Sequence, residues 1–129
     1  MTDDAMVLIG EDEPDNQVIL QTVVEALVGV RAEVAGDGLA VLASVERERP
    51  RMILLDLMLP GLDGFQVTRQ LKGDPATRAI PIVAVSAMAR PDDREAALAA
   101  GCDDFVRKPF ELDDLEALIK KYLNDGGAL

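Results

Sequence analysis

The sequence predicts an α/β fold, a doubly wound five-stranded parallel sheet with helices on both faces. Short apolar runs rich in β-branched residues alternate with amphipathic helical segments along the whole chain. This alternation is typical of right-handed strand–helix–strand units around a parallel sheet. The strongest runs, at residues 6–9 and 52–55, are apolar at every position, as expected for strands buried on both faces. Residues 31–35, 80–85 and 105–106 complete the expected strands.

Residues that favour helix ends bound the segments between these strands. Proline suits a first helical turn and aspartate caps one, so helix starts are expected at Pro14, Asp37, Asp63 or Gly64, and Pro91. Glycine commonly follows a helix, and two helices are expected to end at Gly29 and Gly101. The predicted apolar stripe of the first helix comprises Val18, Ile19, Val23, Leu27 and Val28. That of the last helix comprises Leu112, Leu115, Leu118, Ile119 and Tyr122.

Length and composition indicate one packed domain. A chain of 129 residues has the length of a single domain, and 49% of it is apolar. We expect one domain over 1–129, with a folded core over 5–124 and a tail over 125–129. The single Cys102 cannot form a disulfide within the chain and is expected to be a small buried apolar residue.

The charge balance excludes several classes of function. A formal net charge of −11 argues against binding to nucleic acid or to an anionic membrane, since both need clustered Lys and Arg. The chain has no histidine, which excludes Ser-His-Asp and Cys-His nucleophiles and a phosphohistidine of its own. The acidic first residues differ from the basic start of a signal peptide, and the apolar stretch 79–89 is too short to span a membrane. We therefore expect a cytoplasmic protein.

Polar residues follow four of the expected strands. The carboxyl ends of parallel strands meet at one edge of a doubly wound sheet, where ligands bind. The residues predicted to gather there are Glu11, Asp12, Asp56, Ser86 and Lys108. Their convergence from distant parts of the sequence is the main functional signal in this chain.

The charges of this group favour a divalent cation. Two carboxylates about 4 Å apart repel by about 4 kcal/mol at an effective dielectric constant near 20, and one lysine neutralises only one of them. Oxygen ligands from a few protein groups suit Mg²⁺, which also takes phosphate oxygens. A hydroxyl and an ammonium nearby complete a geometry for phosphoryl transfer to an aspartate nucleophile.

Two stretches resemble a known family. They are Leu-Leu-Asp-Leu-Met-Leu-Pro-Gly-Leu-Asp-Gly at 54–64 and Gly-Cys-Asp-Asp-Phe-Val-Arg-Lys-Pro-Phe at 101–110. Both, in this order and with Ser86 between them, resemble the receiver domain of two-component response regulators, of the stand-alone, single-domain type. The resemblance covers essentially the whole chain. It implies a flavodoxin-like (βα)5 fold with strand order 2-1-3-4-5.

The resemblance also implies a role for each residue of the site. Asp56 would be the phosphoacceptor. Asp12, Asp56 and the backbone carbonyl of Met58 would hold Mg²⁺ (or Mn²⁺), with Glu11 acting through a metal-bound water. Ser86 and Lys108 would bind phosphoryl oxygens.

Further implied roles concern switching and phosphoryl lifetime. Ser86 and Phe105 would form the switch pair, and the peptide bond before Pro109 would be cis. Met58 and Met88 lie two residues after Asp56 and Ser86, at positions that influence hydrolysis in the family. Thioethers orient an attacking water poorly, so we expect slow autodephosphorylation.

As a receiver, the chain would take its phosphoryl group from a histidine kinase or a histidine phosphotransfer protein. The expected docking region includes Asp15, Asn16, Ile19 and Phe110. The signal would pass to a protein effector through the surface of the last two helices and the fifth strand. Three roles remain open: an intermediate in a phosphorelay, an allosteric regulator of a kinase, or a motor-type effector. The domain would be a monomer or a phosphorylation-dependent dimer, and would catalyse only its own phosphorylation and dephosphorylation.

Two other readings fit less well. A phosphatase of the haloacid-dehalogenase type needs a second aspartate two residues after the nucleophile, and this chain has Met58 there. A flavodoxin-like cofactor binder needs a phosphate loop after the first strand. The acidic segment 11–15 would repel a flavin phosphate.

Overall fold

One parallel sheet forms the centre of the molecule, with strand order β2-β1-β3-β4-β5. The computed structural model describes residues 5–87, 90 and 92–127. The strands are β1 (Met6–Gly10), β2 (Arg31–Ala35), β3 (Met52–Leu55), β4 (Ile82–Ser86) and β5 (Asp104–Arg107). The predicted doubly wound fold and its strand order are confirmed.

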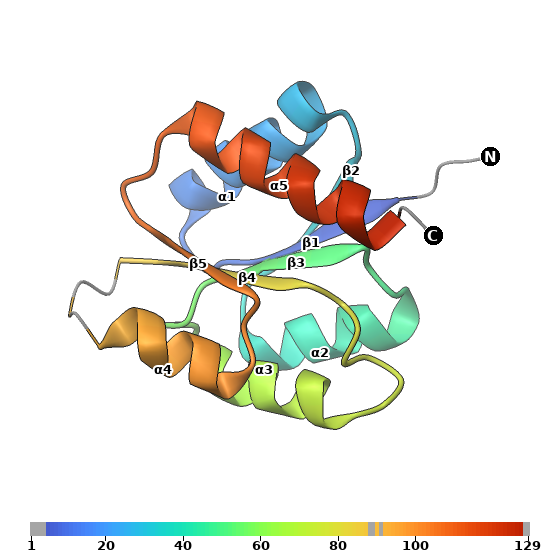
Figure 1. The fold of residues 1–129 in the computed structure, drawn as a ribbon, viewed down its shortest axis with the longest axis vertical. Helices are drawn as coiled ribbons and strands as arrows, with labels where there is room; N and C mark the ends of the chain where they lie inside the picture. The colour runs from blue at the N-terminus through green and yellow to red at the C-terminus, as the bar shows by residue number, and fades with distance from the viewer. Residues whose placement is uncertain (1–4, 88–89, 91, 128–129) are drawn as a thin grey trace.

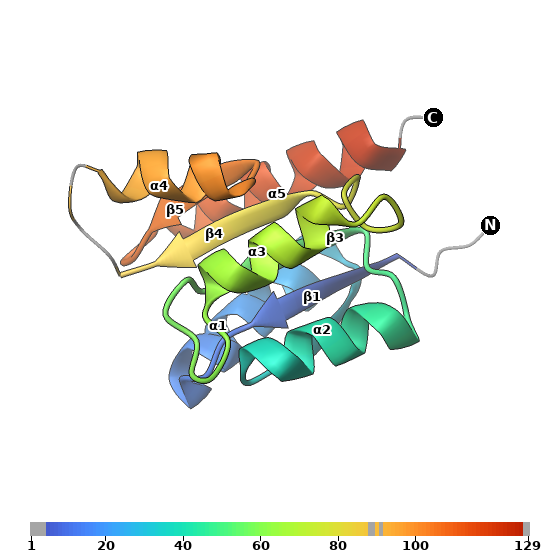
Figure 2. The ribbon, with the colours of Figure 1, turned by 90° about the horizontal axis from the view of Figure 1, so that it is seen from below.

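Helices cover both faces of this sheet (Figure 1). They are α1 (Pro14–Thr22), the π-helix η1 (Val23–Val28), α2 (Gly38–Arg47), α3 (Gly64–Gly73), α4 (Asp93–Ala100) and α5 (Leu112–Gly127). Helices α1 and α5 pack on one face, and α2, α3 and α4 on the other, as Figure 2 shows from a second side. No helix in the described part of the chain is long and apolar enough to cross a membrane.

The core has two halves, one on each face of the sheet. Leu8, Ile53 and Leu55 face the side that Val41, Val67 and Ala97 of α2, α3 and α4 cover. Ile9, Leu54 and Val85 face the side that α1, η1 and α5 cover with Leu20, Val23, Val24, Leu115 and Ile119. Alternate residues of each strand thus contribute to opposite halves, as the pleat of a β-strand requires. This explains why the central strands are apolar at every position.

Most of the predicted helix boundaries are present. The Asp37 carboxylate accepts a hydrogen bond from the Ala40 backbone at 2.8 Å and so caps α2. Asp63 and Gln66 form a reciprocal capping box at the start of α3. Gly29 and Gly101 follow η1 and α4 with φ of +88° and +119°, in the left-handed region that favours glycine. Pro91 lies outside the described residues.

The apolar stripe predicted for the first helix is confirmed at Val23, which is buried, and at Val28, which packs against the core, but it is wrong at its other three positions. Val18 is 62% exposed, Ile19 41% and Leu27 41%. The buried residues are Leu20, Val23 and Val24, which follow the helical spacing i, i+3, i+4. From Val23 the chain continues as a π-helix, whose wider turn changes which residues face the sheet. This change applies to Leu27, whereas Val18 and Ile19 precede the π-helix, in α1, where Leu20 is the buried residue.

Three smaller differences concern the last two strand–helix units. β4 begins at Ile82 instead of Ile80: Pro81 has no N–H to donate, and Ile80 belongs to a turn in which its N–H donates to Thr77 O at 3.0 Å and its carbonyl accepts from the Lys72 ammonium at 2.8 Å. Leu112, expected in the α5 stripe, is 48% exposed at the first position of the helix. α5 continues to Gly127, three residues into the predicted tail, because nothing before the glycines at 126 and 127 stops a helix.

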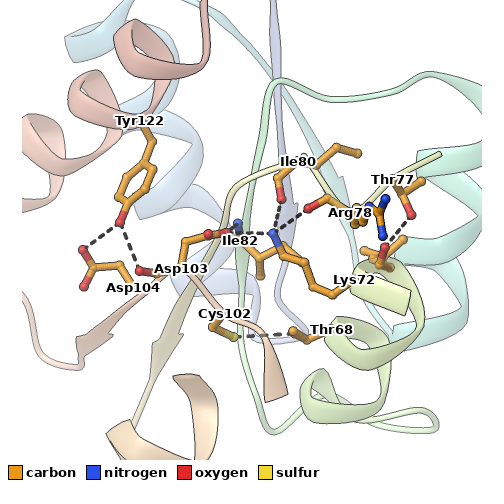
Figure 3. A network of polar contacts seen from close by, with 11 residues as sticks. Thr68, Lys72, Thr77, Arg78, Ile80, Ile82, Cys102, Asp103, Asp104 and Tyr122 are labelled. Atoms are coloured by element: carbon orange, nitrogen blue, oxygen red, sulfur yellow. Dashed lines mark hydrogen bonds and ion pairs between the residues drawn. The ribbon is translucent and has the colours of Figure 1, made fainter. Parts of the chain in front are cut away.

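A network of polar contacts joins the amino ends of β4 and β5 to α3 and α5 (Figure 3). The Lys72 ammonium donates to the carbonyls of Arg78 and Ile80 and to the Asp103 carboxylate, at 3.1, 2.8 and 2.9 Å. The same Asp103 oxygen accepts from the Ile82 backbone at 2.8 Å. The Tyr122 hydroxyl lies 3.1 Å from the Asp103 carbonyl. Hydrogen bonds therefore connect the amino ends of β4 and β5 to the helices beside them.

The described chain begins and ends at this same amino edge. Ala5 precedes β1, and Asn124 lies near the end of α5. Both line one surface pocket of about 360 Å³, together with Val28, Val30 and Leu123. The carboxyl edge, at the other end of the strands, carries the residues considered next.

Candidate functional site

Three carboxylates meet at the carboxyl edge of the sheet. Glu11 and Asp12 directly follow β1, and Asp56 directly follows β3. Backbone hydrogen bonds hold these positions, since Glu11 N donates to Ala35 O at 3.0 Å and Asp56 N donates to Gly10 O at 2.8 Å. One carboxylate oxygen from each of the three residues lies within 4.8 Å of the other two. Glu11 and Asp56 are buried and Asp12 is exposed, so the cluster opens to solvent on the Asp12 side.

Lys108 bridges the two buried carboxylates. Its ammonium donates to Glu11 Oε1 at 2.7 Å and to Asp56 Oδ2 at 3.1 Å. Burial by itself lowers the pKa of Lys108, but the hydrogen bonds and negative charges of Glu11 and Asp56 outweigh it and raise that pKa above its usual value. The ammonium is therefore charged at neutral pH.

The remaining oxygens of the buried carboxylates accept hydrogen bonds from the backbone. Glu13 N donates to Glu11 Oε2 at 3.1 Å, and Met58 N donates to Asp56 Oδ1 at 2.9 Å. The Gln17 amide donates to the Glu11 carbonyl at 2.7 Å. Both buried side chains are thus fixed by two contacts each.

The fourth and fifth strands place the other predicted residues. Ser86 ends β4 and is fully buried, and Lys108 N donates to its carbonyl at 2.9 Å. Phe105 of β5 is half-buried against the core on the α2–α3–α4 side. The peptide bond between Lys108 and Pro109 is cis. Met58 is 62% exposed, and Met88 lies outside the described residues.

A pocket adjoins this site. It measures about 430 Å³ and extends from Lys108 and Pro109 to the exposed side of α1 and the start of α5. Its other lining residues are Asn16, Ile19, Ala87, Phe110 and Leu112. The lining is thus largely apolar, and its charged residue, Lys108, belongs to the acidic site.

The donor set of the site fits a hard divalent cation. The three clustered side chains offer oxygen atoms only, and the Lys108 ammonium pairs with two of the three carboxylates, those of Glu11 and Asp56. Oxygen ligands with excess negative charge are what Mg²⁺ and Mn²⁺ prefer. Asp12 is the member that solvent reaches, so a cation that keeps several waters has room on that side.

Sequence reasoning did not anticipate every contact of the site. It assigned Glu11 to a metal and Lys108 to a phosphoryl group, whereas the two side chains here form an ion pair. It also missed Gln17, a helix residue that no local pattern distinguishes. It gave no account of Gly10, although a glycine in a strand often marks close approach by other groups. A Cβ at Gly10 would lie 2.8 Å from Leu55 Cδ1 and 2.9 Å from Val41 Cγ2.

Comparison with known sequences identifies the family. Residues 7–120 match the sequence model of the response regulator receiver domain. The chain is 35% identical over 119 residues to the polar-differentiation response regulator DivK of Brucella anthropi, covering 92% of this chain and 96% of DivK. It is 40% identical over 107 residues to the response regulator PleD of Caulobacter vibrioides, covering 83% of this chain and only 23% of PleD. The chain thus corresponds to one part of PleD and to nearly all of DivK.

Solved structures agree with this result. The receiver domain of the sensor histidine kinase PA1611 from Pseudomonas aeruginosa PAO1, which has a magnesium ion in its active-site cleft, aligns with a TM-score of 0.85 and 34% identity, covering 95% of this chain and 99% of that one. The receiver domain of a histidine kinase from Syntrophus aciditrophicus aligns with a TM-score of 0.87 and 30% identity, covering 94% of this chain and 91% of that one. Together with the site at the carboxyl edge, these matches show that the chain belongs to the response regulator receiver domains of two-component signalling.

Proposed function

We propose that this domain accepts a phosphoryl group on Asp56 from the phosphohistidine of a histidine kinase or of a histidine phosphotransfer protein. The observation that carries the proposal is the contact of the buried Asp56 carboxylate with the Lys108 ammonium, beside Glu11 and Asp12. A fixed carboxylate next to a cation, at the open edge of a doubly wound sheet, is placed to act as a nucleophile.

The proposed reaction is a single transfer. An Asp56 carboxylate oxygen attacks phosphorus, the phosphorus–nitrogen bond of the donor breaks, and the new phosphorus–oxygen bond forms an acyl phosphate. Lys108 would release its contact with Asp56 and bind a phosphoryl oxygen, and Ser86 would bind another. Mg²⁺ or Mn²⁺, held by Asp12, Asp56 and the Met58 carbonyl with Glu11 outside the direct ligand set, would supply the positive charge that the phosphoryl oxygens need.

The signal would leave through α4, β5 and α5. Ser86 ends β4, and Phe105 lies on the neighbouring β5, paired with Ala84 two residues before Ser86. A movement of Ser86 toward a phosphoryl group would therefore be coupled to repacking of Phe105. Phe105 has no hydroxyl, so its two positions would differ only in packing. A protein effector would read this change.

The donor would dock at the pocket beside the site. Asn16, Ile19 and Phe110, expected at the docking region, line this pocket together with Lys108. A partner seated there would bring its phosphohistidine close to Asp56. The proposal includes a cytoplasmic location, where such donors act, and a monomer or a phosphorylation-dependent dimer.

The test is covalent modification of Asp56. We expect acetyl phosphate with Mg²⁺ to add one phosphoryl group to the wild-type chain by intact mass, and beryllofluoride with Mg²⁺ to raise its melting temperature. The Asp56→Asn variant should show neither change, because the amide is not a nucleophile. An adduct that persists in Asp56→Asn, or no adduct on the wild type, would contradict the proposal.

The phosphoryl group should be lost slowly. Met58 is exposed beside Asp56, and its thioether cannot orient an attacking water as a polar side chain can. The Met58→Asn variant should therefore hydrolyse faster than the wild type, as measured by intact mass after removal of the phosphodonor. Met88→Asn tests the second predicted position in the same way. A wild-type lifetime of only a few seconds with Mg²⁺ present would contradict this expectation.

A further inference from the structure

Gly38, the first residue of α2, lies directly against the loop that follows Asp56. A Cβ at this position would stand 1.8 Å from the Leu62 carbonyl oxygen and 2.7 Å from the Leu62 carbonyl carbon. The Gly38 backbone N–H points to the same loop and donates to the Pro60 carbonyl at 3.4 Å. The start of α2 therefore touches the backbone of this loop, and only a glycine fits there.

The loop itself is held on its other side by the core. Leu57 and Leu59 are buried, whereas Met58 between them is exposed. Gly64 N donates to the Leu57 carbonyl at 3.1 Å and closes the loop. Leu57 and Leu59 are thus held by the core, and the carbonyls of Pro60 and Leu62 lie against the first residue of α2, whereas the side chains of Met58 and Pro60 are exposed.

We propose that Gly38 is a positioning residue for the metal site. Because it has no side chain, it lets the start of α2 support the loop at Pro60 and Leu62, so that Asp56 and the Met58 carbonyl keep their places. The inference rests on the proposed function, because it concerns the cation-binding role given there to Asp56 and Met58. A side chain at position 38 would push against the backbone of the loop, and the clash could be relieved only by moving the loop and the start of α2 apart.

The size of the clash sets the expected effect. A Cβ at 1.8 Å must move by about 1.5 Å relative to Leu62 O to reach an ordinary carbon–oxygen contact of roughly 3.3 Å. Changes to groups that orient metal ligands commonly reduce metal affinity by about 10–100-fold. We expect Gly38→Ala to weaken Mg²⁺ binding by at least about tenfold.

Two other glycines provide matched controls. Gly36 lies two residues earlier, and a Cβ there would meet only Gln17 Nε2, at 4.0 Å. Gly101 lies at the amino edge of the sheet, with φ +119° and a Cβ position 2.8 Å from Lys72 Cγ. Gly36→Ala should leave stability and affinity unchanged. Gly101→Ala should lower the melting temperature without affecting a site at the other edge.

The experiment is a calorimetric titration of the four proteins with MgCl₂, accompanied by melting curves without metal. The proposal predicts reduced affinity in Gly38→Ala alone, at a stability comparable to that of Gly101→Ala. Wild-type affinity in a folded Gly38→Ala, or equal losses in Gly38→Ala and Gly101→Ala, would overturn it. If the wild-type protein binds no Mg²⁺, the proposed metal site itself is wrong. This outcome differs from the two that contradict only the role of Gly38.

The wild-type protein gives a second readout that needs no variant. If the loop and α2 act as one rigid unit, Mg²⁺ should slow hydrogen exchange of the Gly38 amide, which donates to Pro60 O. The amide of Gly73, at the exposed end of α3, should exchange at the same rate with and without Mg²⁺. Unchanged exchange at Gly38 would contradict the proposal even if Gly38→Ala does not fold.

Discussion

Gly10 lies at a position where the core leaves no room for a side chain. It ends β1, and methyl groups of Leu55 and Val41 occupy the space that a Cβ would need. In contrast to Gly38, the opposing atoms at Gly10 belong to side chains, so the backbone need not move. An alanine here overpacks the core, which typically costs about 1–3 kcal/mol.

We expect Gly10→Ala to lower the free energy of unfolding by this amount in urea denaturation. Combined with Val41→Ala, it should cost less than the sum of the two single losses, because Val41→Ala removes one of the two methyl groups that clash with the new Cβ. Gly73→Ala is the control, since a Cβ there meets nothing within 4 Å. If the two core substitutions are simply additive, the packing explanation of Gly10 is wrong.

Cys102 is a second residue whose surroundings determine its behaviour. It is 5% exposed, and its sulfur lies 3.6 Å from the Thr68 hydroxyl. Burial raises the pKa of the Cys102 thiol, and the Thr68 hydrogen bond opposes this only in part. The pKa of Cys102 is thus higher in the folded than in the unfolded chain. The thiol therefore contributes fully to the free energy of unfolding at pH values below its unfolded pKa, and this contribution is lost as the pH rises through its folded pKa.

The buried, protonated thiol should therefore react slowly. At pH 8 we expect almost no labelling of the native protein by a thiol reagent over a time in which the urea-unfolded chain reacts fully. Intact mass measures the extent of labelling in the native and in the unfolded protein. Rapid labelling of the native protein would show that α4 opens readily from the core.

At the scale of elements, Asp103 joins α3, β4 and β5 at the amino edge. One of its carboxylate oxygens accepts from both the Lys72 ammonium and the Ile82 backbone (Figure 3). Its side chain is 38% exposed, so the ion pair with Lys72 contributes little by itself. The larger effect is the loss of an acceptor for Ile82 N–H at the start of a buried strand.

Asp103→Ala should destabilise the protein by about 2 kcal/mol, the order expected when a buried donor loses its partner. Asp103→Asn keeps one acceptor oxygen and should recover about half of the loss. Glu46→Ala, on the exposed side of α2, should change stability by less than about 0.5 kcal/mol. Urea denaturation distinguishes these variants, and equal stability of Asp103→Ala and wild type would contradict the role given to this contact.

The elements differ in how well their sequence reveals them. Caps such as Asp37 and Asp63 act within a few residues, so the sequence alone located the starts of α2 and α3. The exposure of Leu27 was mispredicted because it lies in a π-helix, for which Val23–Val28 carries no local signal. In α1 itself the prediction chose Val18 and Ile19, whereas Leu20 is the buried residue. The contact of Lys72 with the Ile80 carbonyl, just before β4, could not be predicted, because no local pattern shows where this side chain donates.

The same distinction holds for the candidate site. Asp12, Asp56 and Lys108 were placed together because each directly follows a strand and the sheet topology brings strand ends to one edge. The pairing of Glu11 with Lys108 could not be predicted, since it depends on the geometry of side chains 97 residues apart. The role of a glycine such as Gly38, which lies directly against another part of the backbone, cannot be predicted from the sequence, because it depends on where that backbone lies.

At the scale of the whole molecule, part of the excess negative charge lies at the candidate site. The chain carries a net charge of −11. Three carboxylates cluster at the site, and the Lys108 ammonium pairs with two of them. Carboxylates within 4.8 Å of each other repel by about 1 kcal/mol even at the dielectric constant of water. A bound divalent cation would relieve this repulsion.

Mg²⁺ should therefore raise the melting temperature of the wild type, and Asp12→Ala should lose most of this rise. The same variant should melt above the wild type in the absence of metal, because one repelling carboxylate is gone. Asp15→Ala, on the exposed first turn of α1, is the control and should respond to Mg²⁺ as the wild type does. Equal Mg²⁺ shifts in wild type and Asp12→Ala would exclude Asp12 as a ligand.

The shared pocket of Ala5 and Asn124 has a consequence for engineering. The described chain enters and leaves the fold at neighbouring points, on the edge of the sheet farthest from Asp56. A flexible peptide of a few residues could join these points, and new ends could be opened in an exposed connection such as the one around Gly29. Reporter proteins attached at Ala5 and Asn124 would likewise stand side by side, clear of the carboxyl edge.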